Sequence, residues 1–224
     1  TNFNIRSNIP DTLPGAWIAP FVLDPNEPNT LFVGLNDLWK STDQGDNFTL
    51  VKDFPDGPVM LGLRVIAIAP SNSLRIVVAN KDSIYRTHNG GGSWLNITDH
   101  FPLTISDDRL ITDIVYKDDD DDTYWVTLNS YDEHGVYMTT DDGTTFTNVS
   151  YGLPEVPVKC IIQNTLVSSY AELYCATPAG VFVKPGDQPW LPFNNNLPKV
   201  DCNWLDIHYE GANSKLRVGT FGRG

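Results

Sequence analysis

The chain has 224 residues, of which 41% are hydrophobic and 19% charged, a composition typical of a folded protein rather than a disordered one. No apolar run in the sequence approaches the roughly 18–20 residues that a membrane-spanning helix needs. The formal net charge of −13, with only 15 Lys and Arg residues, argues against a nucleic acid as partner, because binding to phosphate backbones draws mainly on basic side chains. An acidic sequence with few lysines is common among exported proteins, so we expect an extracellular or cell-surface location.

A short motif occurs three times and organises the chain. It consists of a hydroxyl residue, any residue, Asp or Asn, any residue, Gly, two further residues and an aromatic residue. The copies span 41–48 (STDQGDNF), 87–94 (THNGGGSW) and 139–146 (TTDDGTTF), so the aromatic residues are 46 and 52 positions apart. The same spacing reaches back to Phe3 and forward to Trp190. The repeat that contains Trp190 keeps the aromatic residue but has lost the motif Asp. About five repeat units are therefore visible.

Within each unit, short segments rich in β-branched and aromatic residues recur in one order. First strands are expected at 17–23, 63–69, 110–116, 158–163 and 205–209. Second strands follow at 31–34, 75–79, 124–127, 173–176 and 216–219, and third strands at 38–40, 84–86, 136–138 and 181–183. The aromatic residue of the motif opens the fourth strand, and no segment has a convincing helical pattern. Four antiparallel strands in every 44–52 residues predict an all-β fold, a β-propeller of four-stranded antiparallel blades.

On these repeats the chain resembles the Asp-box (BNR, bacterial neuraminidase repeat) propellers, which include sialidases, xyloglucanase-type glycoside hydrolases and sortilin-type receptor domains. The resemblance runs from residue 3 to residue 224. It implies that the Asp-box hairpins lie on the periphery of the blades, away from the axial site.

The blade number stays open between two alternatives. The strand at Phe3 could complete the last blade and close a five-bladed ring, or the chain could be part of a propeller of six or more blades. We favour the larger propeller because the sequence stops in the middle of a repeat. Residues 1–224 are thus interpreted as a single Asp-box propeller domain or a fragment of one, with units ending near 10, 55, 101, 154 and 198 and the last unit incomplete.

The motif residues allow a structural and a functional interpretation. Asp43, Asn89 and Asp141 could contact a carbohydrate or Ca²⁺, or they could accept bonds from backbone N–H groups of their own turn while Gly supplies a positive φ. We favour the structural role because the spacing suits local hydrogen bonds. The structural Asp-box residues are then Ser41, Asp43, Gly45, Phe48, Thr87, Asn89, Gly91, Trp94, Thr139, Asp141, Gly143 and Phe146.

Acidic residues between the repeat units are the candidates for catalysis, since in the resembling family these connections typically line the top face of the propeller. A glycosidase needs two carboxyl groups, one as acid and one as base or nucleophile. Asp107 or Asp108 together with Asp201 is the candidate pair. A sialidase would in addition need an arginine triad and a tyrosine nucleophile, for which we find no pattern. The acids of these connections are Asp53, Asp56, Asp107, Asp108, Glu155 and Asp201.

Exposed aromatic side chains are candidates for binding, because sugar faces stack on aromatic rings. Trp17, Tyr131, Tyr151 and Trp204 lie at or near expected loops and are the binding candidates.

A possible Ca²⁺ site and a possible disulfide remain. Asp118 to Asp122 form a run of five carboxylates, and Ca²⁺ takes six to eight oxygen ligands. The run lacks the interleaved ligands and turn glycine of an EF-hand loop, so we favour a solvated, self-repelling loop and expect no other metal or cofactor. Cys160 and Cys175 fall on adjacent expected strands, where they could pair or remain buried thiols.

These observations favour a non-catalytic extracellular binding module that presents propeller-face loops to a glycan or protein partner. A glycoside hydrolase of xyloglucanase-like type, acting through two axial carboxylates, is the alternative. It would show facing carboxyl groups about 5–5.5 Å apart for retaining or about 6.5–9.5 Å for inverting chemistry. A third hypothesis, a receptor-like peptide-binding propeller, would show an apolar tunnel at the same place.

Overall fold

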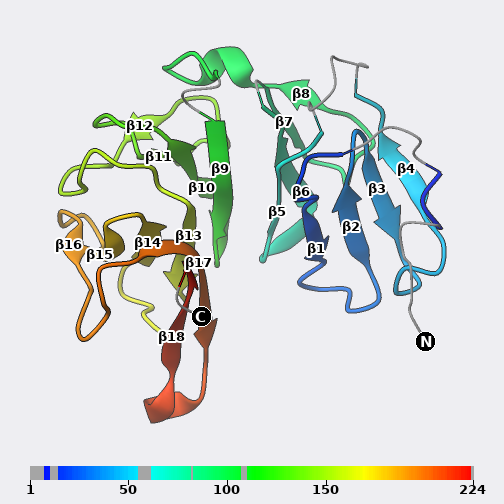
Figure 1. Ribbon diagram of the computed structural model, residues 1–224. Coiled ribbons are helices and arrows are strands. Elements are labelled where there is room, and N and C mark those ends of the chain that lie inside the picture. The colour runs from blue at the N-terminus through cyan, green and yellow to red at the C-terminus, as the bar shows by residue number, and fades with distance from the viewer. Residues whose placement is uncertain (1–7, 11–14, 55–61, 82, 107–109, 223–224) are drawn as a thin grey trace. The chain divides into compact units, whose positions relative to one another are not determined.

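The computed structural model describes residues 8–10, 15–54, 62–81, 83–106 and 110–222. It divides into two compact units, Thr1–Asp107 with Asp119–Asp121, and Asp108–Asp118 with Asp122–Gly224. Both units consist of antiparallel β-sheets (Figure 1). The described ranges contain no α-helix, only short 3-10 turns such as Thr98–His100 and Gly211–Asn213. The predicted all-β fold is confirmed.

The first unit contains two four-stranded sheets in which each strand pairs with the next along the chain. The strands of the first sheet are β1 (Phe21–Leu23), β2 (Leu31–Gly34), β3 (Leu38–Ser41) and β4 (Thr49–Lys52). The strands of the second sheet are β5 (Val65–Ala69), β6 (Asn72–Ala79), β7 (Ile84–Thr87) and β8 (Leu95–Asn96).

The second unit holds most of a third sheet, a complete fourth sheet and a two-stranded ribbon. The third sheet comprises β9 (Leu110–Lys117), β10 (Asp120–Asn129), β11 (Val136–Thr139) and β12 (Thr147–Asn148). The fourth comprises β13 (Cys160–Asn164), β14 (Glu172–Thr177), β15 (Gly180–Pro185) and β16 (Leu191–Pro192). The ribbon pairs β17 (Asp201–His208) with β18 (Lys215–Phe221).

The expected and observed strands differ mainly in the first strand of a sequence repeat. The strand expected from residue 17 begins only at Phe21, directly after Pro20. Proline has no N–H for a strand ladder, which explains the late start. In contrast, β17 begins at Asp201 rather than at residue 205, because Asp201 and Cys202 pair with Phe221 and Thr220 across a bulge.

Side chains packed between neighbouring sheets form the core of each unit. In the first unit, Phe32 and Leu38 lie in one buried cluster with Ile66 and Ile76. Close packing also explains the small residue that ends β2, because a Cβ on Gly34 would lie 2.8 Å from Cβ of Leu63.

The core of the second unit is centred on two buried indole rings. Trp125 and Trp190 belong to one buried cluster that also contains Ile161 and Phe182. These residues come from β10, β13 and β15 and from the turn before β16, so the cluster joins the third sheet to the fourth.

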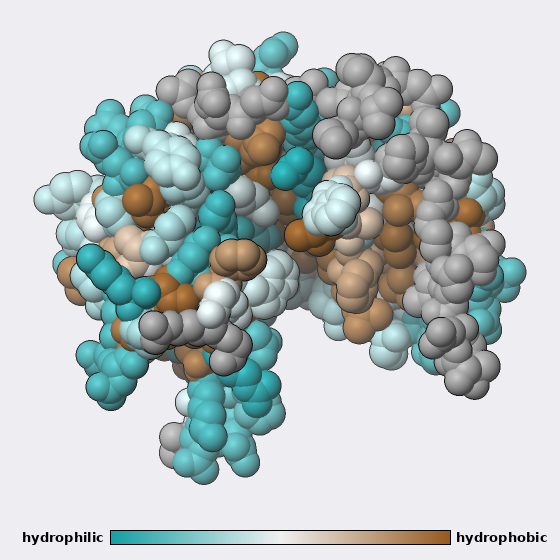
Figure 2. Space-filling model, in the orientation of Figure 1, coloured by the Kyte–Doolittle hydropathy of each residue, from teal (hydrophilic) through white to brown (hydrophobic). Residues whose placement is uncertain are grey.

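Exposed apolar side chains occur on particular strands. On β1, Phe21 and Leu23 are 74% and 62% exposed, and brown apolar residues are visible over this sheet in Figure 2. The β17–β18 ribbon buries Leu205 on one face, while Trp204 and Phe221 are exposed. Its tip around Gly211–Asn213 is hydrophilic, as the teal projection in Figure 2 shows. Among the described residues, no helix has the length and apolarity required to cross a bilayer.

Candidate functional site

The Asp-box turns close on themselves through one hydrogen-bond pattern. In the first turn, Oγ of Ser41 donates to Oδ1 of Asp43 over 2.7 Å and accepts the N–H of Gly45 over 2.8 Å. Oδ1 of Asp43 also accepts the N–H of Asn47 over 2.9 Å, and its Oδ2 accepts Nδ2 of Asn47 over 2.7 Å. The hydroxyl and the carboxylate therefore bind groups of their own hairpin.

The second turn repeats this pattern with an amide in place of the carboxylate. Oγ1 of Thr87 donates to Oδ1 of Asn89 over 2.9 Å and accepts the N–H of Gly91 over 3.1 Å. Oδ1 of Asn89 accepts the N–H of Ser93 over 2.8 Å. An Asn side chain is therefore sufficient for this pattern.

The third turn has the same geometry as the first. Oγ1 of Thr139 donates to Oδ1 of Asp141 and accepts the N–H of Gly143, both over 2.8 Å. Thr145 donates its N–H to Oδ1 and its hydroxyl to Oδ2 of Asp141, again over 2.8 Å.

Two consecutive residues of each turn have positive φ, a feature that the motif does not reveal. The glycine of the template is one of them. The residue before it is the other: Gln44, Gly90 and Asp142 have φ of 61°, 65° and 53°. Gln and Asp are uncommon in this region, so its occupation was not expected from the sequence.

The hydrogen bonds hold the box carboxyl groups in their charged form. Bonds from Asn47, followed by the Ser41 hydroxyl, lower the pKa of Asp43 to about 2. Burial raises the pKa of Asp141, but bonds from Thr145 and Thr139 outweigh it and leave that pKa below its ordinary value. Neither carboxyl holds a proton at neutral pH, so neither can act as a general acid there.

The fourth sheet has a different turn because the box residues are missing. On the spacing that equates Trp190 with Phe146, Val183 replaces the motif hydroxyl and Pro185 the motif Asp. The self-closing pattern cannot form, and β15 instead continues to Pro185. The turn is held by Gly186, whose N–H donates to the carbonyl of Ala171 over 2.9 Å.

A hollow of about 480 Å³ lies beside this altered turn, in the second unit. Tyr151 and Tyr170 line it and are 82% and 44% exposed, whereas Trp125 on its floor is 3% exposed. We call it the tyrosine hollow. Its lining comprises Trp125, Met138, Asn148, Val149, Tyr151, Tyr170, Ala171, Leu173, Lys184, Gly186, Asp187, Gln188 and Pro189.

The rim of the tyrosine hollow carries both donors and acceptors. Nζ of Lys184 donates to the carbonyl of Gln188 over 2.6 Å. Burial lowers the pKa of Lys184, and the charge of Asp187 opposes that shift. Nδ2 of Asn148 donates to the carbonyl of Glu133 over 3.0 Å. One positive and one negative charge thus lie on a rim that is otherwise neutral.

A second hollow, of about 410 Å³, shares Asn148 and Tyr151 with the first. Glu133 and Glu155 both line it, and both side chains are exposed. It thus brings two carboxyl groups to one depression with an aromatic ring beside them.

Family and structural comparisons agree with this fold. A family model described as "Sortilin, neurotensin receptor 3" (Sortilin-Vps10) matches residues 36–176, which is more than half of the chain. The chain belongs to the Sortilin-Vps10 family. The resemblance to Asp-box propellers of sortilin type is thereby confirmed. No curated protein matches the chain.

Solved structures of the same fold include members of other propeller families. An ancestral GH74 enzyme is 20% identical with a TM-score of 0.69, covering 91% of this chain and 29% of its own. The GH74 xyloglucanase from Xanthomonas campestris is 14% identical with a TM-score of 0.67, covering 91% and 35%. YCF48 bound to D1 peptide is 13% identical with a TM-score of 0.61, covering 94% and 69%. The chain therefore spans about a third of the length of the two GH74 enzymes.

The predicted catalytic pairing of Asp107 or Asp108 with Asp201 stays a prediction, because part of it lies outside the described residues. Asp107 and Asp108 lie outside the described residues, as does Asp56. Asp201 was expected in a loop, but it is the first residue of β17 and pairs with Phe221. Its Oδ1 is buried and accepts no hydrogen bond.

The four predicted binding aromatics occupy different surroundings. Trp17 is fully exposed before β1, and Tyr131 is 75% exposed after β10. Trp204 is 65% exposed but lies on β17 rather than in a loop. Tyr151 lines both the tyrosine hollow and the second hollow, and sequence reasoning missed its neighbour Tyr170.

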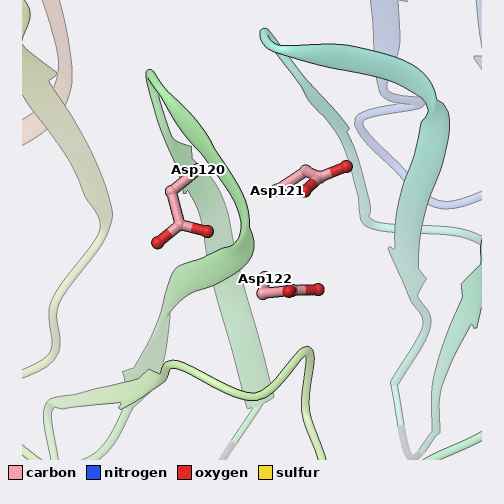
Figure 3. Close-up of side chains that lie close together, drawn as sticks. All are labelled: Asp120, Asp121 and Asp122. Carbon is pink, nitrogen blue, oxygen red and sulfur yellow. The ribbon is translucent and has the colours of Figure 1, made fainter.

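The acidic run Asp118 to Asp122 is a tight hairpin, not the solvated loop that we expected. β9 ends at Lys117 and β10 begins at Asp120, so only two residues form the turn. Asp120, Asp121 and Asp122 have carboxylate oxygens within 4.8 Å of one another (Figure 3). Asp121 accepts Nδ2 of Asn72 over 2.7 Å and pairs with Arg75 over 3.3 Å, which neutralises part of the repulsion.

An acidic residue that the sequence analysis passed over, Asp113, joins two sheets of the second unit. Its Oδ2 accepts the N–H of Ile161 over 3.0 Å, which ties β9 to β13. Its Oδ1 accepts the N–H of Ile114 over 2.9 Å. Burial raises its pKa to about 7 against the lowering effect of both bonds. An acid inside an otherwise apolar strand was the signal that could have identified it.

The cysteines are free thiols. Cys160 is paired with Ala176, and Cys175 with Ile161, so the two cysteines point to opposite faces of their sheet. They lie in different buried clusters and form no disulfide. Burial raises the pKa of Cys160 to about 12, so it is protonated at neutral pH.

Proposed function

We propose that this chain is a non-catalytic binding module of an exported or cell-surface protein, and that it contacts a glycan or protein partner through the tyrosine hollow. The observation that carries this proposal is the exposure of two tyrosine rings, Tyr151 and Tyr170, above a buried apolar floor. Tyrosine is suited to contact surfaces because it offers an apolar ring together with a hydrogen-bonding hydroxyl.

The alternative contact sites of the described chain are less suitable. The Asp-box side chains Asp43, Asn89 and Asp141 already bind backbone groups of their own turns. The tyrosine hollow, in contrast, combines apolar lining with a few polar groups and has a volume in the range of small-molecule sites, about 300–1,000 Å³.

Two solved structures of the same fold represent the two partner classes. One is called a xyloglucanase, which is an enzyme acting on a glycan, and another is described as bound to a peptide. Both are below 25% identity, so they share the fold, and the partner of this chain follows from its own side chains.

The test is a binding screen with matched variants. The chain is immobilised and probed with soluble xyloglucan, other plant and bacterial polysaccharides, and a displayed library of random peptides. We expect reversible binding of a probe that is weakened in Tyr151→Ala and Tyr170→Ala. Tyr131→Ala is the control, because Tyr131 is 75% exposed and lines neither hollow. Binding that survives both hollow variants would show that the contact surface lies elsewhere.

A glycoside hydrolase is the second candidate, favoured by Glu133 and Glu155 in the hollow next to Tyr151. Two carboxyl groups flanking a groove are what glycoside hydrolysis requires. The assay is release of reducing ends from xyloglucan and β-glucans, with Glu133→Gln and Glu155→Gln as variants. Product formation that both variants abolish would establish the enzyme, and binding without product would exclude it for these substrates.

A further inference from the structure

We propose that the tyrosine hollow is a subsite for a neutral saccharide, whose sugar rings stack on Tyr151 and Tyr170 while rim groups bind the hydroxyls. This inference rests on the proposed binding function and narrows its partner to one chemical class. Three features of the hollow support it: the anchoring of the two tyrosines, the chemistry of the rim, and the short strands at its border.

Tyr151 is fixed by the buried Trp190. The carbonyl of Tyr151 accepts the N–H of Trp190 over 2.9 Å, and Nε1 of Trp190 donates to the carbonyl of Val149 over 2.8 Å. The next residue, Gly152, has φ of +100°, and a Cβ there would lie 2.4 Å from the carbonyl oxygen of Trp190. The backbone of Tyr151 is therefore held against a residue that is 1% exposed.

Tyr170 is fixed by the turn that has lost its Asp-box. Gly186 has φ of +57°, and a Cβ there would lie 3.2 Å from Cβ of Tyr170. The N–H of Gly186 donates to the carbonyl of Ala171, the residue after Tyr170. The backbone that carries both tyrosines is thus positioned before a ligand arrives, which reduces the ordering entropy lost on binding.

The rim chemistry fits hydroxyl groups. Asp187 is an acceptor only and Lys184 a donor only, while the amide of Gln188 offers both. A sugar hydroxyl donates and accepts, so it can bind each of these groups. The charges of Lys184 and Asp187 offset each other locally, and the net charge of −13 repels polyanions at longer range. These features favour a neutral ligand.

The strands beside the hollow disfavour an extended peptide. A peptide that adds to a sheet needs a free strand edge with regular N–H and C=O groups. The outer strands of the third and fourth sheets, β12 and β16, have only two residues each. β16 also contains Pro192, which lacks an N–H.

The experiment measures affinity by calorimetry for three probes: a neutral xyloglucan oligosaccharide, polygalacturonate as an acidic glycan, and a peptide selected from a random library on the immobilised chain. We expect the neutral oligosaccharide to bind. Tyr151→Ala and Tyr170→Ala should each weaken binding by about tenfold, from loss of aromatic contact and apolar area. Tyr151→Phe and Tyr170→Phe keep the ring and should bind nearly as well as the original chain.

The outcomes separate this inference from the proposed function. Neutral-oligosaccharide binding that the alanine variants weaken and that Tyr131→Ala leaves unchanged supports both. If the peptide or polygalacturonate binds in a manner that depends on Tyr151 and Tyr170, the neutral-saccharide inference is overturned and the hollow remains the contact surface. If no probe binds in a tyrosine-dependent manner, both are overturned.

Discussion

The carboxyl group of Asp113 predicts a defined pH dependence of stability in the second unit. Burial raises its pKa from 3.8 to about 7, although the N–H groups of Ile161 and Ile114 bind its charged form. The folded chain therefore binds more protons than the unfolded chain between these values. Stability is highest where the carboxyl is protonated in both states, falls as pH rises from about 4 to about 7, and is constant above that range. Asp113→Asn replaces the carboxyl by a group that does not titrate.

The size of the effect follows from the shift. One pKa unit corresponds to about 1.4 kcal/mol, so the raised pKa of Asp113 lowers the free energy of unfolding, relative to its value at low pH, by about 2 kcal/mol at pH 5.5 and about 4 kcal/mol at pH 8. The free energy of unfolding of the original chain should therefore fall by about 2 kcal/mol relative to Asp113→Asn over this interval. This value of about 2 kcal/mol is an upper bound, because Asp113 is only half-buried and retained solvation weakens the cost of burying its charge.

The assay compares urea unfolding of the two proteins at several pH values between 5.5 and 8. Intrinsic fluorescence follows the unfolding, and Trp125 and Trp190 contribute to its change because both indoles are buried in the core of the second unit. The thiol of Cys160, with a pKa of about 12, does not titrate in this interval. Other titrating groups are common to both proteins and cancel in the difference. Hydrogen exchange at the amide of Ile161 gives a local measurement of the same effect.

Asp206→Asn is the control substitution. Asp206 is exposed on β17 and lies 3.6 Å from Arg217, so its replacement should change stability little in the same titrations. Parallel stability curves for the original chain and Asp113→Asn would refute the reasoning, because the carboxyl would then have the same pKa in the folded and unfolded chain.

Four further predictions concern the turns and the core. In urea titration, Ser41→Ala should destabilise the first unit by about 1–3 kcal/mol, because the hydroxyl of Ser41 joins Asp43 to Gly45. Ser41→Thr introduces the residue found in the other two turns and should be nearly neutral in the same titration. Gly91→Ala should lower the melting temperature, because its Cβ would lie 2.2 Å from Cγ1 of Val51 and φ at this position is +104°. Gly211→Ala is the control: its Cβ would have no atom within 4 Å, so it should cost only backbone strain. Trp190→Ala should destabilise the second unit by about 3–5 kcal/mol through cavity formation and abolish ligand binding at the tyrosine hollow, as judged by thermal unfolding and calorimetry. With its pKa lowered to about 2, Asp43 stabilises its turn above pH 3.8 and loses this effect as pH falls through 2. The NMR amide shift of Asn47 should therefore titrate with a midpoint near 2, while that of Ser93, bound to the non-titrating Asn89, should not.

The Asp-box turns were the most readable part of the sequence, for a local reason. The bonds that the side chains of Ser41 and Asp43 make in the first turn join residues no more than four positions apart, so spacing alone places donor and acceptor together. The left-handed backbone at Gln44 and Asp142 was not readable, because the N–H groups of these residues donate to the carbonyls of Asn29 and Asp122, which are distant in the sequence.

The strand order was also predictable, since each strand pairs with its neighbour along the chain and carries its own apolar pattern. Boundaries were less predictable where pairing overrides local preference. Asp201 joined a strand because β18 offered it a partner at Phe221, and Asp120 to Asp122 joined β10 because the β9–β10 ladder continues up to a two-residue turn.

The sequence by itself determined the repeat, the all-β class and the loss of the Asp-box in the repeat that contains Trp190, because these depend on residue types at short, regular spacings. Only the tertiary structure placed Tyr151 beside Tyr170, turned Cys160 and Cys175 to opposite faces, and set the carboxyl of Asp113 against the amide of Ile161. Those contacts join residues of different strands and sheets, where packing decides which side chains meet. No local pattern in the chain records that choice.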